Sequence, residues 1–175
     1  MIRNRVLWPL LVLSGTAAAA GVALTPEAIT KSVASLGARA SLSRLYENKA
    51  KWSKLLTGIA SGEPGWLDVA KRLHPVSDGG ASEQLGLAVG EALEHRPANV
   101  LSLTLTEFRI EIVCGGPDVD DPRFDSYDLS MAAIEQRQRM LRALRISTLT
   151  AARDACVNEL EKAKAGIAHF YGRGG

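Results

Sequence analysis

The C-terminal part of the chain carries an apolar stripe with the period of an α-helix. Between residues 149 and 170, apolar side chains recur at steps of three or four residues, which places them on one face of a helix. The members of this stripe are Leu149, Ala152, Cys156, Leu160, Ala163, Ile167 and Phe170. A short helix with one apolar face is stable only when that face is buried, so the stripe predicts a packed helical domain.

Shorter stripes of the same period occupy most of the preceding chain, and prolines or glycines separate them. Thr25-Pro26-Glu27, for example, provides a cap residue, a proline for the first helical position and an acid for the first turn. Gly37 leaves open whether the residues after it continue this helix or begin a second one. The predicted helical segments are approximately 25–46, 47–61, 63–74, 82–95, 99–113, 128–146 and 149–170.

The composition supports this fold class. Apolar residues make up 46% of the 175, whereas aromatic residues make up only 5%. The core must therefore consist mainly of leucine, alanine, valine and isoleucine, a mixture that favours helices over a β-sandwich. We predict an all-α fold, a compact array of about six to eight short helices, that forms a single domain over residues 21–175.

Two of the predicted helix pairs share a register. A displacement of 33 residues places Trp52 on Leu85 and Pro64 on Pro97, with apolar residues matched between them. A helix, a proline-started turn and a second helix at this period are typical of stacked α-hairpins, as in α-solenoids. With only two copies, two unrelated amphipathic hairpins would explain the pattern equally well, so both interpretations stay open.

Residues 100–113 have an ambiguous pattern. Leu101, Leu103 and Leu105 alternate with polar residues, which is the period of a β-strand. The preceding Pro97 and the helical neighbours favour instead a single helix that ends near Cys114. We expect a helix here and keep the strand as the alternative.

The N-terminus has the features of a secretory signal peptide. Two arginines in the first five residues precede an apolar run at 6–13 and small residues at 14–20. This order predicts a signal peptide over residues 1–20, cleaved near Ala19 or Ala20, and therefore a periplasmic or secreted protein. The alternative is an uncleaved anchor, which would make the membrane a partner, because residues 6–24 are just long enough to span a bilayer.

Cys114 and Cys156 are the two cysteines of the chain. Disulfides persist in exported proteins, so the predicted signal peptide favours a Cys114–Cys156 bridge. The bridge would close a loop of about 43 residues. The alternative is a pair of buried free thiols, since cysteine is common in protein cores.

The charge balance excludes one class of partner. The chain has 21 basic and 19 acidic residues, and two of the basic ones belong to the predicted signal peptide. The remaining 19 and 19 cancel, whereas nucleic-acid binding requires a basic surface that neutralises phosphates. The last two predicted helices carry a run of arginines between residues 137 and 153, which Glu135, Asp154, Glu159 and Glu161 offset. This balance indicates a solvated helix face, and contact with an anionic surface is the alternative.

No residue pattern indicates catalysis or a cofactor. The chain lacks a G-x-S-x-G nucleophile motif, a phosphate-binding glycine loop and the H-E-x-x-H zinc motif. The acidic segment 118–128 does not match a calcium-binding EF-hand, because Arg123 and Leu129 occupy the sixth and twelfth positions. We predict no catalytic, cofactor or metal residues, interpret 118–128 as a polar loop, and leave calcium binding open.

The stretch 58–103 contains a Ser-Gly-x-x-x-Trp-Leu turn, an Asp-x-Gly turn and an Ala-Leu-x-x-x-Pro helix end. The residues of these motifs are Ser61, Gly62, Trp66 and Leu67; Asp78 and Gly80; and Ala92, Leu93 and Pro97. In these motifs the stretch resembles a group of uncharacterised secreted, all-helical proteins from proteobacteria. The resemblance implies export and a later cysteine pair, here Cys114 and Cys156, and it implies no activity.

Export without catalytic motifs favours a helical module that binds another envelope or secreted protein. An inhibitor of, or immunity protein against, a toxic or cell-wall-degrading enzyme is one concrete version. The predicted partner surface comprises Trp52, Trp66, Asp78, Gly79 and Gly80, although a core position is the favoured interpretation of both tryptophans. The alternative function is a periplasmic hydrolase that acts on the cell wall, which would need two converging carboxylates, one with a raised pKa.

Overall fold

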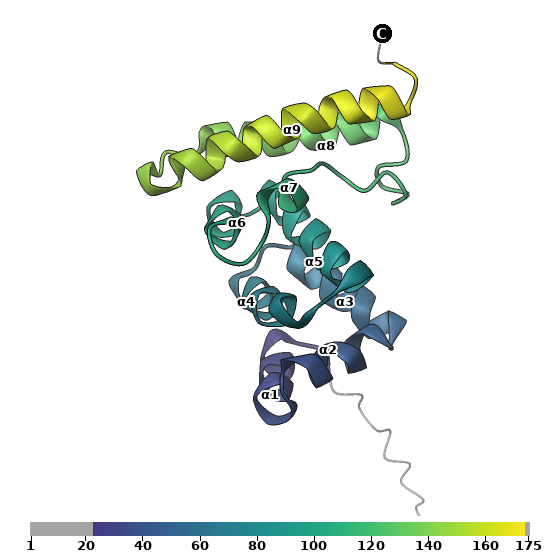
Figure 1. The fold of residues 1–175 in the computed structure, drawn as a ribbon, viewed down its shortest axis with the longest axis vertical. Helices are drawn as coiled ribbons and strands as arrows, with labels where there is room; N and C mark the ends of the chain where they lie inside the picture. The colour runs from purple at the N-terminus through teal and green to yellow at the C-terminus, as the bar shows by residue number, and fades with distance from the viewer. Residues whose placement is uncertain (1–22, 174–175) are drawn as a thin grey trace, which may run out of the picture.

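A computed structural model describes residues 23–173, and this range is helical and contains no strand (Figure 1). The predicted signal peptide, with Ala19 and Ala20, lies outside the described residues. The α-helices are α1 (Pro26–Leu36), α2 (Ala38–Tyr46), α3 (Lys49–Ala60), α4 (Pro64–Leu73), α5 (Gly79–Glu91), α6 (Pro97–Thr104), α7 (Ile110–Val113), α8 (Tyr127–Ala143) and α9 (Thr150–Phe170), and the 3₁₀ helices are η1 (His74–Val76), η2 (Ala92–Glu94) and η3 (Ser147–Leu149). The all-α prediction is confirmed. None of the helices within residues 23–173 is long and apolar enough to cross a bilayer.

The described range holds nine α-helices, more than the six to eight expected, because two predicted segments are divided. Gly37, at a φ of 84°, separates α1 from α2. The expected single helix over residues 99–113 is wrong, and so is the strand alternative. The chain instead forms α6, a turn that reaches Arg109 in extended conformation, and the short α7. The turn buries Phe108 against the ring of His74, with the ring centroids 4.1 Å apart.

Side-chain caps fix several helix starts. The backbone N–H of Ala28 donates to the hydroxyl of Thr25 at 3.2 Å, as the Thr-Pro-Glu pattern predicts. Asn48 caps α3, and Ser126 caps α8 by accepting from the backbone N–H of Leu129 at 3.3 Å. Asp128, which follows this cap, lies in the first turn of α8, where its charge interacts favourably with the helix dipole.

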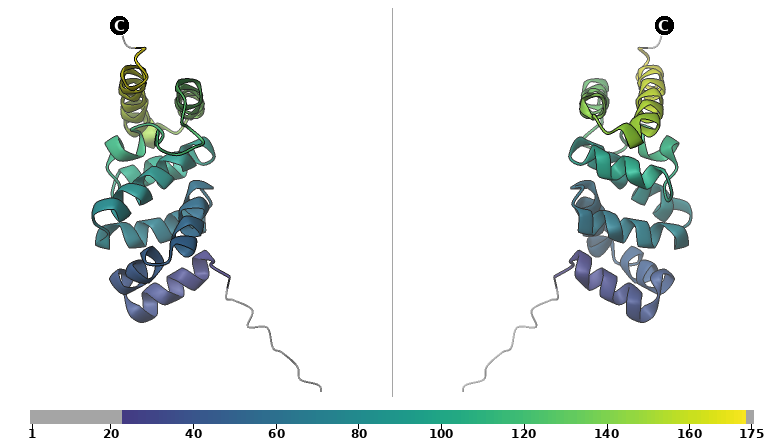
Figure 2. Two further views of the ribbon diagram at one scale, coloured as in Figure 1. Left: turned by 90° about the vertical axis from the view of Figure 1, so that its right-hand side faces the viewer. Right: turned by 90° about the vertical axis from the view of Figure 1, so that its left-hand side faces the viewer.

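The helices are arranged as hairpins stacked in layers (Figure 2). Helix α3 packs against α5, while α4 packs against both α1 and α6. Pro64 and Pro97 each occupy the first turn of the second helix of a pair, and Trp52 and Leu85 are both buried. The displacement of 33 residues therefore relates two hairpins, α3–α4 and α5–α6, that stack on one another. The long α8–α9 hairpin covers the end of this stack and contacts η2, α6 and α7.

Helix α5 is packed on several sides because two glycines let α7 approach it closely. A Cβ atom at Gly90 would lie only 2.5 Å from the carbonyl oxygen of Val113. Gly86, one turn earlier, faces the side chain of Ile112 in the same way. Small residues at this spacing place α7 directly against the backbone of α5, and Cys114 follows α7 immediately.

The predicted disulfide between Cys114 and Cys156 is confirmed. The two Cα atoms are 5.3 Å apart, and both residues are fully buried. The bridge joins the end of α7 to the N-terminal third of α9, and so links the hairpin stack to the hairpin that covers it.

The close approach of α5 and α7 leads to a testable expectation. Gly90→Ala should lower the free energy of unfolding by about 2 kcal/mol, because the added methyl group overlaps a backbone oxygen that cannot move alone. Gly166→Ala is the matched control: nothing lies within 4 Å of that position in α9. It should raise the stability by about 0.5–1 kcal/mol through helix propensity. Urea denaturation followed by circular dichroism measures both, and a stabilised Gly90→Ala variant would contradict the packing.

An ion pair with a buried arginine links α8 to η2 in the hairpin stack. The Arg137 side chain is 1% exposed, and its Nε donates to Glu94 Oε1 at 3.1 Å. Burial lowers the pKa of Arg137 from its ordinary value, while the negative charge of Glu94 opposes that effect. Within residues 23–173 no partner is present for its Nη2 atom. The expectation of a solvated face is therefore wrong for Arg137, although Arg139 and Arg142 on the same helix are exposed.

Candidate binding groove

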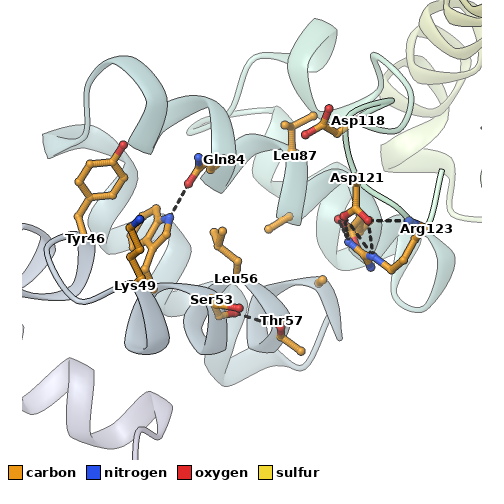
Figure 3. A pocket seen from close by; sticks show the side chains of 14 residues that line it. Tyr46, Lys49, Ser53, Leu56, Thr57, Gln84, Leu87, Asp118, Asp121 and Arg123 are labelled. Atoms are coloured by element: carbon orange, nitrogen blue, oxygen red, sulfur yellow. Dashed lines mark hydrogen bonds and ion pairs between the residues drawn. The ribbon is translucent and has the colours of Figure 1, made fainter. Parts of the chain in front are cut away.

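A groove of about 860 Å³ runs between α3 and α5, and the segment 117–125 closes one of its ends (Figure 3). Tyr46 and Lys49 lie at the opposite end, where the ring of Trp52 packs edge-on against that of Tyr46, with the centroids 5.0 Å apart. The remaining lining residues are Ser53, Leu56, Thr57, Ala60, Gln84, Leu87, Ala88, Glu91, Asp118, Asp121 and Arg123.

Helix α3 presents two different faces, and the groove face is the more polar one. Positions that recur at helical spacing from Lys49 to Ala60 line the groove, with Ser53 and Thr57 on its rim. The opposite face buries Leu55 and Ile59 completely. The helix is thus fixed by its core face, while the groove face stays accessible.

Helix α5 supplies the second wall through Gln84, Leu87, Ala88 and Glu91, again at helical spacing. Leu87 is half-buried, and together with Leu56 of α3 it forms an apolar floor. The wall is joined to α3 at one end because the indole N–H of Trp52 donates to Gln84 Oε1 at 2.5 Å.

Arg123 holds the loop end of the groove in place. Its guanidinium donates to both Glu91 carboxylate oxygens, at 2.7 and 3.0 Å, and also to the carboxylate of Asp121. Bidentate pairs of this kind fix geometry as well as charge. The hydrogen bonds from Arg123 lower the pKa of Asp121 from its ordinary value, so this carboxyl stays ionised.

Two charged residues of the lining make no such pair. Neither Lys49 nor Asp118 has an oppositely charged side chain within 4.0 Å in the described part of the chain. Both side chains are exposed, at opposite ends of the groove. They are the groups best placed to meet charges on a bound molecule.

The predicted partner surface is divided in the structure. Trp52 lines the groove, although it is only 7% exposed. Trp66 lies instead against α3 at Gly58, where a Cβ atom would be 2.5 Å from its ring, and it is not part of the groove lining. A Cβ atom at Gly80 would be 3.2 Å from the Tyr46 hydroxyl, next to the Trp52 end. Asp78 is the N-cap residue that precedes α5, and Gly79 borders a separate hollow with Glu111 and Ile112.

The acidic segment 118–128 has local partners for several of its carboxylates. Asp118 accepts from the backbone N–H of Asp120 at 3.0 Å, Asp121 is paired with Arg123, and the exposed Asp128 lies 4.0 Å from Arg173. Within residues 23–173, no group of three or more acidic, histidine or cysteine side chains is placed to hold a metal ion.

Trp52 is the lining residue that the predicted partner surface included, and Leu87 and Arg123 are among the lining residues that it missed. Leu87 lies between the buried Leu85 and Ala88 in a segment that is apolar on every side. Its exposure depends on how many neighbours surround α5, which periodicity does not reveal. Arg123 lies in a loop far along the chain, and only the folded structure places it against Glu91.

These features define an all-α stack of hairpins with an open, apolar-floored groove between the first helices of two consecutive hairpins. Comparisons with protein-family models, with curated proteins and with solved structures find no match to this chain. The assignment of a role therefore depends on the geometry of the groove.

Proposed function

We propose that this protein is an exported helical module that binds a segment of another envelope or secreted protein in the α3–α5 groove. The observation that carries the proposal is the apolar floor of Leu56 and Leu87, half-buried between polar walls. An accessible apolar centre with a polar rim is the usual anatomy of a protein interface. Inhibition of, or immunity to, a toxic or cell-wall-degrading enzyme is the concrete version we favour.

The dimensions of the groove suit an extended peptide segment. Lys49 and Ala60, at the two ends of the α3 face, are eleven residues apart. At 1.5 Å per residue the helix rises roughly 16 Å between them. An extended chain covers this length with about five residues. A loop or chain end of a partner could therefore lie along the whole groove.

The disulfide supports export. Structural disulfides form and persist in oxidising compartments and are rare in the cytosol. The Cys114–Cys156 bridge is consistent with the predicted signal peptide and with the resemblance to secreted proteins.

The alternative, a cell-wall hydrolase, is not favoured by the groove. Of the three carboxylates that line it, those of Glu91 and Asp121 converge on Arg123, which is bound to both. A glycan-cleaving general acid needs a raised pKa, whereas the pKa of Asp121 is lowered.

Selection of peptides on the oxidised protein tests the proposed function. Peptides of twelve random residues that are enriched on the wild type should bind Leu87→Arg at least about tenfold more weakly, because a charged side chain then occupies the floor. The matched control is Leu105→Arg, since Leu105 is 59% exposed and lies outside the groove. Leu105→Arg should bind the enriched peptides with the affinity of the wild type, as measured by fluorescence anisotropy. Failure to enrich any peptide, or equal binding by all three proteins, would refute the proposal.

A further inference from the structure

We infer, on the basis of the proposed function, that the groove selects its partner segment by charge order. The preferred segment has an acidic residue that meets Lys49, apolar residues over Leu56 and Leu87, and a lysine or arginine that meets Asp118. This charge pattern goes beyond the proposed function, which concerns only where a partner segment binds.

The loop end of the groove is acidic. Three carboxylates, those of Glu91, Asp118 and Asp121, line it, and Arg123 provides one positive charge against them. Arg123 is already committed to Glu91 and Asp121. This end therefore has a net charge of −2, and Asp118 is the carboxylate still free to pair with a cation on the partner.

The opposite end is basic. Lys49 lies at this end with Tyr46, whose ring packs against that of Trp52, and it is the single charged residue of the lining there. The indole N–H of Trp52 is directed to Gln84, so it does not compete for an acidic ligand. The ammonium group of Lys49 is therefore the donor that an aspartate, a glutamate or a carboxyl terminus would meet.

The stretch between the two ends carries no charge. Leu56, Leu87, Ala88 and Ala60 are apolar, and Ser53 and Thr57 on the rim are neutral. The two charged ends are separated by roughly the 16 Å length of the α3 face, which exceeds the screening length at physiological salt. Each end consequently acts on its own part of the bound segment, and charges of the wrong sign are repelled locally.

Four synthetic peptides with the same apolar centre test the inference. One carries a glutamate at one end and a lysine at the other, and the others carry two lysines, two glutamates or two glutamines. Fluorescence anisotropy at low salt should show the glutamate–lysine peptide bound about fivefold more tightly than either peptide with like charges, the size expected for exposed ion pairs. Lys49→Glu should shift the preference to the two-lysine peptide by a similar factor.

Lys54→Glu provides the matched control, because Lys54 is an exposed lysine of the same helix outside the groove lining. It makes the same change in net charge and should leave the peptide preference unchanged. Equal affinity of all four peptides for the wild type, with binding lost in Leu87→Arg, would overturn the charge-order inference and leave the proposed function intact. An equal shift in Lys49→Glu and Lys54→Glu would also overturn it. Absence of binding by every peptide would count against both.

Discussion

Loss of the disulfide is expected to lower the free energy of unfolding by about 4 kcal/mol, the cost of releasing a closed loop of roughly 43 residues in the unfolded chain. The bridge between Cys114 and Cys156 spans a sequence separation of 42 and joins α7 to α9. Reduced wild-type protein should therefore unfold at a distinctly lower urea concentration than oxidised protein. Circular dichroism with and without dithiothreitol measures the difference.

The double variant Cys114→Ala/Cys156→Ala is the control for this experiment. It should be at least as unstable as the reduced wild type, because it also removes two buried sulfur atoms, and dithiothreitol should not change it further. The segment 115–125 follows the bridge directly and supplies Asp118, Asp121 and Arg123 to the groove. Equal stability of oxidised and reduced protein would show that the link between the stack and the α8–α9 hairpin contributes nothing.

Glu94→Ala is expected to lower the free energy of unfolding by about 3 kcal/mol, because it leaves the Arg137 charge buried without its partner. Arg137→Met removes the charge itself and keeps much of the side-chain volume, so it should cost less. The double variant Glu94→Ala/Arg137→Met should lose less stability than the sum of the losses in the two single variants. Urea denaturation of all three variants measures this difference, which is the coupling energy between the two side chains.

Glu135→Ala is the matched control for Glu94→Ala. Glu135 also belongs to an ion pair, with Arg139 at 3.9 Å, but both side chains are more than half exposed. Exposed pairs contribute less than about 1 kcal/mol, so this variant should be nearly as stable as the wild type. Similar losses for Glu94→Ala and Glu135→Ala would mean that the burial of Arg137 has no energetic consequence.

The helical fold and the stacked hairpins could be predicted from local patterns. Apolar spacing, capping residues and prolines act within a few residues, so the stripes and the displacement of 33 between Pro64 and Pro97 are visible in the sequence. The turn before α7 was not predictable in this way. It depends on the burial of Phe108 against His74, a contact between distant parts of the chain.

The groove was only partly predictable for a similar reason. Of the predicted partner surface, Trp52 lines the groove, whereas Trp66 lies against Gly58, because the ring fits where that residue has no side chain. The pairing of Arg123 with Glu91 joins residues 32 apart, and the burial of Arg137 depends on how α8 crosses η2. Charge patterns along the sequence do not contain this information, since the same arginines would suit a solvated helix.

An NMR titration of the oxidised, ¹⁵N-labelled protein with a peptide selected on it locates binding most directly. The largest changes in amide chemical shift should fall on the groove faces of α3 and α5, at residues such as Ser53, Thr57 and Leu87, and on the loop at Asp118. The amides of α9 beyond Cys156, which belong to no residue of the groove lining, should change little. Changes confined to the α8–α9 hairpin, with α3 and α5 unaffected, would place binding elsewhere and contradict the role assigned to the groove.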